Sequence, residues 1–319
     1  MDKAPLKVAF IVPPKVHLLD ITGPAHVFYE AKDEGAPLEL IFSNIIKGQH
    51  EAESSSMLAF YKLVDFSGIN LGKGDLVFIP GIESSLLLSR EFLDACKPFQ
   101  QWLREQYQRG AVLCSVCTGA FLLADAGLLD GKQCTSHWKY LDEIHKRYPK
   151  LKVLDNRLFV SDSDIYTSAG VTSGIDLALH ILEKKLGSYF AAKIAKEVVV
   201  YHRRSEKDPQ LDAFMLYRNH LDHRIHAVQD MLAQNLSDQT AIEVLAEKVC
   251  MSPRNLTRLF KKTTQITIGS YIAQLRISHA VKLLNEGYTL QAAADSCGLK
   301  STAHLRRMIA KSSTAAMSG

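Results

Sequence analysis

The sequence has no apolar run long enough to cross a membrane. Its first hydrophobic stretch, residues 8–12, ends at Pro13 and Pro14 and is too short for a membrane span or a secretory signal. Cysteine is scarce as well: the six cysteines follow no disulfide-like spacing, which is typical of reduced thiols in a cytosol. These absences predict a cytoplasmic protein with no membrane partner.

Charge is nearly balanced over the whole chain but not along it. At 319 residues the chain exceeds one ordinary domain, and its composition is that of a globular protein. The overall net charge is +4, yet residues 217–319 carry a net charge of +6 and residues 1–216 a net charge of −2. A basic segment of this kind predicts binding to a phosphate backbone.

Residues 1–201 alternate short β-branched runs with helical patterns. Strands are expected at 7–12, 38–42, 75–80 and 111–117, and a helix at 91–109. This alternation predicts a doubly wound, flavodoxin-like α/β domain with a parallel sheet, whose ligand site lies at the carboxyl ends of the strands. A polar stretch from His202, with Pro209, predicts a linker over 202–220.

Residues 221–319 are expected to be all-α and contain one pattern twice. AIEVLAEKVCMSPRNLTRLFKK and LQAAADSCGLKSTAHLRRMIAK each combine a short helix, a tight turn, a serine and a helix with arginine and lysine. The copies align at an offset of 48 before the turn and 49 after it, so Arg258 corresponds to Arg307. Two tandem helix-turn-helix motifs predict a unit that binds double-stranded DNA.

Helix caps mark the first copy. Thr240 and Glu243 have the spacing of a capping box, and Ser252 followed by Pro253 predicts the start of the next helix. Only residues 250–251 separate the two helices, which must therefore cross steeply and expose the second one to a DNA groove.

The second copy repeats these signals. Thr289 and Ser301 are expected to cap its helices, and Gly298 to form its turn. Between the copies, residues 271–284 carry their own apolar stripe and are expected to hold the two motifs at a fixed separation. Ordinary helices with solvated charges are the alternative, but they would not explain matched caps, cores and basic positions.

Polar side chains on the second helix of each copy are the expected DNA contacts. Leu256, Leu259 and Phe260 should pack inward. Arginine and asparagine can pair with base edges, whereas lysine more readily contacts phosphates. The expected contacts are Arg254, Asn255, Thr257, Arg258, Lys261 and Lys262 in the first copy and Lys300, Thr302, Arg306 and Arg307 in the second.

The segments LAEKVCMSPRNLTRLFKK, YIAQLRISHAVKLL and AAADSCGLKSTAHLRR resemble the AraC/XylS family of bacterial transcription regulators. The resemblance covers residues 221 to the end and implies two recognition helices in adjacent major-groove segments. Gln265 and Ile268 stand where the family usually has glycine and proline, and Ile309 where it has an aromatic residue. The sequence closes on SSTAAMSG, so the family's final packing helix is expected to be missing and sequence recognition to rest mainly on the first copy.

Cys117 lies where the expected strand 111–117 meets a helix, in AVLCSVCTGAFLLADAGLL. A sharp turn of this kind projects a side chain above the sheet, and the amides of the helix are expected to stabilise a thiolate there. Thr118, Gly119 and Ala120 supply the small residues that such a turn requires.

The segments LLDITGPAHVF, IPG, VCTGAFLLADAGLLDGK, TSHW and SAGVTSGIDLALH resemble the ThiJ/PfpI superfamily, the class I glutamine-amidotransferase-like fold. They are similar to the branch with isonitrile hydratases and with amidase-like domains fused to AraC-type regulators. The resemblance implies that Cys117 takes the position of the nucleophile and Asp20 that of the acid facing it, beside Thr118 and Gly81. Thr118 replaces the histidine of proteolytic members, which argues against protease activity. Ile82 replaces the second glycine of the usual P-G-G segment.

Two other interpretations of the cysteines are weaker. Cys114, Cys117, Cys134 and His137 have nearly the spacing of a structural zinc site. Cys114 falls inside an apolar strand, however, and the spacer is a packed helix, so neither a metal nor a cofactor is expected. A C-x-x-C redox pair is disfavoured because residues three apart in a strand point to opposite faces.

Two functions are left open. The first is a transcription regulator whose first domain forms a homodimer and senses a small-molecule effector or a redox state. The second is a cysteine hydratase or amidase that uses Cys117 and Asp20. For these two residues themselves, a purely structural role is the alternative. The repeated motif favours the regulator, which is not expected to be an enzyme.

Overall fold

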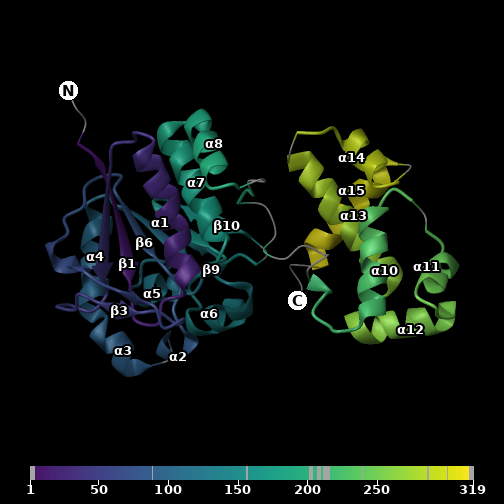
Figure 1. Cartoon of the computed structure of the whole chain (residues 1–319), viewed down its shortest axis with the longest axis horizontal. Coiled ribbons are helices and arrows are strands. Elements are labelled where there is room, and N and C mark those ends of the chain that lie inside the picture. The colour runs from purple at the N-terminus through teal and green to yellow at the C-terminus, as the bar shows by residue number, and fades with distance from the viewer. Residues whose placement is uncertain are drawn as a thin grey trace. The chain divides into compact units, whose positions relative to one another are not determined.

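In a computed structural model the chain divides into two compact units, residues 1–210 and 211–319 (Figure 1). The structure describes residues 4–87, 89–155, 157–200, 204–206, 210, 216–238, 240–285, 287–299 and 301–315. Of the linker expected at 202–220, residues 202–203, 207–209 and 211–215 therefore lie outside the described residues. No helix in the described ranges is both long and apolar enough to span a bilayer.

A seven-stranded sheet forms the centre of the first unit. Its order is β10-β11-β7-β6-β1-β2-β5, and every neighbouring pair is parallel except β10 with β11. The strands are β1 (Leu6–Val12), β2 (Leu38–Asn44), β5 (Val64–Asp65), β6 (Leu76–Ile79), β7 (Val112–Val116), β10 (Phe159–Asp162) and β11 (Ile165–Ser168). The four predicted strands are thus confirmed, and β6 and β7 are buried at every position, as central parallel strands must be.

Helices cover both faces of this sheet (Figure 1), and each face has its own core. One face carries α1 (Leu18–Asp33), α7 (Ser173–Leu186) and α8 (Ser188–Glu197), packed over Phe10 and Phe78. The other carries α2 (Ser84–Leu87), α3 (Arg90–Ala95), α4 (Lys97–Gln108), α5 (Gly119–Asp125) and α6 (Leu141–Arg147). Two short ladders complete the unit, β3 (Ala52–Glu53) with β4 (Ala59–Phe60) and β8 (Gln133–Cys134) with β9 (Lys152–Val153). The doubly wound α/β fold is confirmed.

The single helix expected at 91–109 is instead two helices. α3 ends and α4 begins at Cys96, and Pro98 lies in the first turn of α4. In a continuous helix the ring of Pro98 would clash with the carbonyl of Asp94, whereas in a first turn its missing N–H needs no partner. The chain therefore ends one helix and starts another.

All the elements of the second unit in the described ranges are helices. They are α10 (His223–Gln234), α11 (Ile242–Lys248), α12 (Pro253–Thr264), α13 (Ile268–Asn285), α14 (Leu290–Ser296) and α15 (Thr302–Ala315). Tyr271 and Leu275 of α13 are buried in a core with α10, α11 and α12, and Ala280 is buried in a second core with α14 and α15. α13 thus joins the two motifs, as the apolar stripe at 271–284 predicted.

Helix caps in both copies largely follow the prediction. The Asn255 amide donates to Ser252 Oγ at 3.3 Å, and the Ala292 amide donates to Thr289 Oγ1 at 3.2 Å. Ser301 directly precedes α15, and its carbonyl accepts hydrogen bonds from the first turn of that helix.

The capping box predicted at Thr240 and Glu243 is wrong. Ala241 is the N-cap of α11, with no side-chain cap, and its carbonyl accepts the first hydrogen bonds of the helix. Because α11 begins one residue later than predicted, Glu243 is the second residue of the helix. A capping box needs the glutamate at the third residue, from which its side chain can reach back to the N-cap amide. Burial of Leu245 and Ala246 determines where this helix begins, and it outweighs the local capping signal.

The residues that depart from the usual AraC/XylS pattern after α12 are accommodated. Gln265 ends α12 with a left-handed φ of 65°, and its side-chain amide donates to the Lys262 carbonyl at 2.8 Å. Ile268 begins α13 and is buried in the first core. Gln265 therefore ends α12 in the left-handed conformation that glycine usually adopts at this position.

Candidate functional site

Cys117 lies in the turn between β7 and α5, as predicted. Its φ of 57° is left-handed, which costs a residue other than glycine about 1–2 kcal/mol. Backbone partners hold it there: its amide donates to the Ser168 carbonyl at 3.0 Å, and Ser136 Oγ donates to its carbonyl at 2.9 Å. The surrounding structure thus imposes a strained conformation on the residue that faces the carboxyl edge of the sheet.

The residues predicted to form the pocket come together around Gly81. A Cβ on Gly81 would lie 2.5 Å from Asp20 Oδ2 and 2.9 Å from both Cys117 Cβ and Thr118 Oγ1, so no other residue fits there. Asp20 comes from the first turn of α1, and Gly81 and Cys117 follow β6 and β7. The group lies where ligands bind in doubly wound sheets.

Thr118 ties the loop after β6 to this turn. Its hydroxyl donates to the Ile82 carbonyl at 3.1 Å and accepts from the Ile82 amide at 3.0 Å. Ile82, which replaces the second glycine of the usual segment, therefore has no free amide to offer to a reacting oxygen.

The carboxyl of Asp20 is buried beside the thiol of Cys117. Burial raises the pKa of Asp20, although the Val171 amide, which donates to Oδ1 at 2.6 Å, opposes this effect. Burial and, after it, the charge of Asp20 raise the pKa of the Cys117 thiol well above its usual range. The expectation of a thiolate stabilised by the helix amides is wrong, because desolvation outweighs the amides.

Two histidines lie near the same edge of the sheet. His17 precedes α1 and was not predicted; its amide donates to the Gly81 carbonyl at 2.9 Å. Burial, then the charges of Lys139 and His17, lowers the pKa of His137. Its ring lies 5.5 Å from that of Trp138, whose side chain is exposed. The position of His17 directly before LLDITG was the available signal for it.

The exposed face of α12 is the second candidate site. Leu256 and Phe260 are fully buried and Leu259 packs against the same core, as predicted. The opposite face exposes its polar side chains, and none of its cations forms an ion pair within the described chain. These side chains are Arg254, Asn255, Thr257, Arg258, Lys261 and Lys262.

Three arginines of this unit that lie outside the two second helices are engaged internally. Arg218 pairs with Asp230 and Arg224 with Asp222, whereas Arg276 donates to the backbone carbonyls of residues 236 and 238. The contrast indicates that the α12 cations are left for an external partner.

Each copy has an open groove beside its second helix. The first, of about 420 Å³, is lined by Arg254, Thr257, Arg258 and Lys261 together with Ile242 and residues 267–269 at the start of α13. The second, of about 380 Å³, is lined by Ser301, His304, Arg307 and Met308. His304 occupies the position of Asn255 and was not predicted; the offset of 49 between the copies would have identified it.

The remaining predicted contacts differ in how available they are. Arg306 and Arg307 are exposed, Thr302 is half-buried, and Lys300 lies outside the described residues. The Thr257 hydroxyl donates within its own helix, to the carbonyls of residues 253 and 254 at 3.0 Å, so its methyl group is the part left for DNA.

Known proteins are similar to this chain over both units. The DJ-1/PfpI family matches residues 6–184, and a helix-turn-helix domain matches residues 245–315. The HTH-type transcriptional regulator GbdR of Pseudomonas aeruginosa is 32% identical over 65% of this chain; the match spans 56% of the length of that relative. The HTH-type transcriptional regulator CdhR of the same species is 31% identical over 74% of this chain and 69% of its own length.

Two further similarities are to an enzyme and to a solved structure. Isonitrile hydratase of Pseudomonas putida is 29% identical over 57% of this chain and 73% of its own length. The crystal structure of a ThiJ/PfpI family protein from Pseudomonas syringae has a TM-score of 0.53 at 22% identity, over 72% of this chain and 87% of that protein. The chain belongs to the DJ-1/PfpI family and joins that domain to a helix-turn-helix domain of the AraC type.

Proposed function

We propose that this protein is a sequence-specific DNA-binding transcription regulator. The observation that carries the proposal is the row of exposed cations on α12, which form no ion pair within the described chain and lie beside an open groove, whereas Arg218, Arg224 and Arg276 of the same unit are used internally. The regulators GbdR and CdhR, which are similar over 65% and 74% of this chain, support the same function.

The geometry divides the contacts between bases and phosphates. Arg254, Asn255 and Arg258 lie in the first two turns of α12, the part that enters a major groove, and can pair with guanine and adenine edges. Lys261 and Lys262 lie in its last turn and fit the sugar-phosphate backbone. In the second copy, His304, Arg306 and Arg307 on α15 correspond to Asn255, Thr257 and Arg258.

The first unit is proposed to sense a small molecule or a redox change at the site of Asp20, Gly81, Cys117 and Thr118. Cys hydratase or amidase activity is the alternative, supported by the strained Cys117 turn and the facing Asp20. Three features favour sensing: the thiol has a raised pKa, the Ile82 amide is occupied, and no histidine of the described chain hydrogen-bonds to the thiol.

A homodimer formed through the first unit is part of the proposal. Met57, Leu58 and Tyr61 around the β3–β4 turn are exposed apolar side chains, of a kind that subunit contacts commonly cover. Sedimentation of the intact chain and of Met57→Glu tests this: the substitution should shift the dimer toward monomer, and a monomeric parent would refute the dimer.

Titration of labelled DNA tests DNA binding directly. The DNA is taken from the region upstream of the gene and from a pool of random duplexes, and binding is measured at two salt concentrations with competitor present. Specific binding that weakens steeply with salt is expected. A chain that binds no duplex more tightly than competitor is not a regulator of this kind. Turnover of an isonitrile or amide, abolished in Cys117→Ser, would instead support the enzyme.

A further inference from the structure

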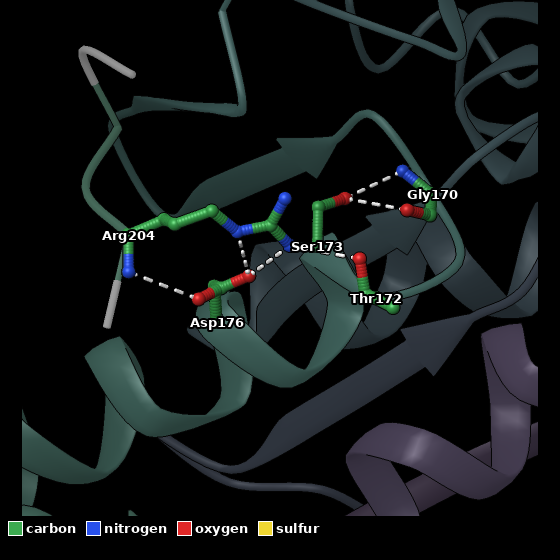
Figure 2. Close-up of polar contacts among 5 residues, drawn as sticks. All are labelled: Gly170, Thr172, Ser173, Asp176 and Arg204. Atoms are coloured by element: carbon green, nitrogen blue, oxygen red, sulfur yellow. Dashed lines mark hydrogen bonds and ion pairs between the residues drawn. The ribbon is translucent and has the colours of Figure 1, made fainter. Parts of the chain in front are cut away.

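The loop between β11 and α7 lies directly against Cys117. Gly170 has a φ of +104°, and a Cβ on it would lie 2.4 Å from Cys117 Cβ and 2.8 Å from Sγ. The side chain of Ser173 fixes this loop, because its Oγ accepts from the Gly170 amide at 2.6 Å and donates to the Gly170 carbonyl at 2.9 Å (Figure 2). The next amide, that of Val171, donates to Asp20. A displacement of the thiol or of Asp20 must therefore move this loop.

Arg204, at the start of the interdomain segment, hydrogen-bonds to the other end of the same loop. Its amide donates to Asp176 Oδ1 at 3.1 Å, and its guanidinium Nε and Nη2 donate to Oδ2 at 3.0 and 2.6 Å (Figure 2). Nη2 also donates to Thr172 Oγ1 at 2.8 Å. Asp176 is in the first turn of α7 and its side chain is only 4% exposed, so the pair is a charge-assisted contact with little competition from water.

A second loop beside Cys117 is held by the same segment. Ser136 Oγ donates to the Cys117 carbonyl at 2.9 Å. Gln210 Nε2 in turn donates to the Ser136 carbonyl at 2.9 Å and to Thr135 Oγ1 at 3.1 Å. Thr135 and Ser136 are both fully buried, so this loop has little room to adjust without breaking its bonds to Gln210.

We propose that Arg204 and Gln210 together form a latch that responds to the state of Cys117. Arg204 and Gln210 each bind one of the two loops that touch this cysteine. A group that occupies the site or modifies the thiol displaces Gly170 or Ser136, and this weakens the hydrogen bonds that Arg204 and Gln210 make to these loops. The inference deepens the proposed sensing role and rests on it. Through the latch, a change at the Cys117 site would alter the segment that leads to the DNA-binding unit.

The latch is tested in the full-length chain with Cys250→Ser, which removes the one exposed cysteine of the described residues. N-ethylmaleimide serves as the probe, and mass spectrometry locates the modified residue. Amide hydrogen exchange is then followed in peptides covering 169–176 and 204–210. Modification of Cys117 is expected to speed exchange in both peptides by roughly tenfold, and Cys117→Ser is expected to abolish the response.

The converse measurement starts from the latch. Arg204→Ala and Gln210→Ala are each expected to raise the rate at which Cys117 is modified by roughly fivefold, because they free the loops that cover it. Lys185→Ala is the matched control: it removes a cation that holds the other end of α7 to the Gly74 carbonyl, far along the helix from Arg204, and should leave the rate unchanged. Cys117→Met enlarges the side chain against Gly170 without any reagent and should speed exchange at 204–210 by itself.

Unchanged exchange at 204–210 after complete modification, or in Cys117→Met, overturns the latch. The latch is also overturned if Cys117 is modified at the same rate in Arg204→Ala as in Lys185→Ala. DNA affinity is measured on the same samples: coupling of Cys117 to residues 204–210 without a change in DNA affinity would keep the latch and remove the sensing role. A change in DNA affinity on modification of Cys117, without that coupling, would remove the latch and keep the sensing role.

Discussion

Cys250 and Gly298 take the same left-handed backbone conformation, with φ of 54° and 65°, at corresponding turns of the two helix-turn-helix copies. The two positions differ in their surroundings. A Cβ on Gly298 would lie 2.1 Å from the Ser237 carbonyl oxygen, whereas Cys250 is exposed. The first copy therefore tolerates a strained side chain that the second copy has no room for.

This difference predicts opposite effects of two reciprocal substitutions. Cys250→Gly should stabilise the second unit by about 0.5–1 kcal/mol, because it removes left-handed strain at some cost in unfolded-chain entropy. Gly298→Ala should destabilise it by about 3 kcal/mol through strain and the clash with residue 237. Urea unfolding measures both. Gly287→Ala, with a φ of +90° and open space, is the control for strain alone; a loss in Gly298→Ala no larger than in this control would contradict the prediction.

A similar pair tests the packing of the first unit. Gly170→Ala is expected to destabilise it by about 2–4 kcal/mol, because the new methyl group has no space beside Cys117. Gly35→Ala, with a comparable φ of +92° and nothing near it, should cost only about 1 kcal/mol. Thermal unfolding followed by circular dichroism compares the two, and equal losses would mean that contact with Cys117 is unimportant.

The raised pKa of Cys117 predicts a pH dependence. The folded state keeps the thiol proton above the ordinary pKa of 9.0, where the unfolded chain loses it, so this group's contribution to stability falls as the pH rises above about 9. Modification of Cys117 should be slow at pH 8. Asp20→Asn removes the neighbouring negative charge and should speed it several-fold, by lowering the thiol pKa.

Asp162→Asn is the control for that effect, since burial and, after it, the charge of Asp162 raise the pKa of Cys134 instead. Modification rates of Cys117 are measured from pH 7 to 10 in both variants. A Cys117 profile for Asp20→Asn that matches the parent would show that the carboxyl does not act on the thiol.

The two DNA-binding copies are predicted to contribute unequally. Arg254→Ala and Arg258→Ala should each weaken specific binding by about 1–3 kcal/mol, more than Arg306→Ala or Arg307→Ala. Lys262→Ala should weaken all duplexes alike and reduce the salt slope by about 1. Arg224→Ala, which removes an exposed arginine paired with Asp222, should change neither. Fluorescence anisotropy gives the affinities, and a larger loss from the α15 arginines would reverse the ranking.

The sequence predicted the parts of the molecule whose physical cause is local. Buried strands such as β7 are continuous apolar runs, and Ser252 with Pro253 is a start signal that acts within one turn. Asp20, Gly81 and Cys117 were placed by resemblance, and the structure brings them together.

What the sequence did not predict depends on segments that are distant along the chain. The bond of Arg204 to Asp176 joins a helix to a linker without any repeating pattern. The raised thiol pKa arises because Asp20 and residues 169–173 jointly bury Cys117. The start of α11 was misplaced because burial of Leu245 outweighed a capping signal. Pro98 was a local signal, and the break between α3 and α4 could have been anticipated from it.

The long helix α13 has a thermodynamic consequence for the second unit. Because one half of it, with Tyr271, completes the first core and the other half, with Ala280, completes the second, neither core can melt without exposing apolar surface of the helix that the other requires. The two helix-turn-helix copies should therefore lose their structure in one cooperative transition, and damage to either one should lower the melting temperature of both.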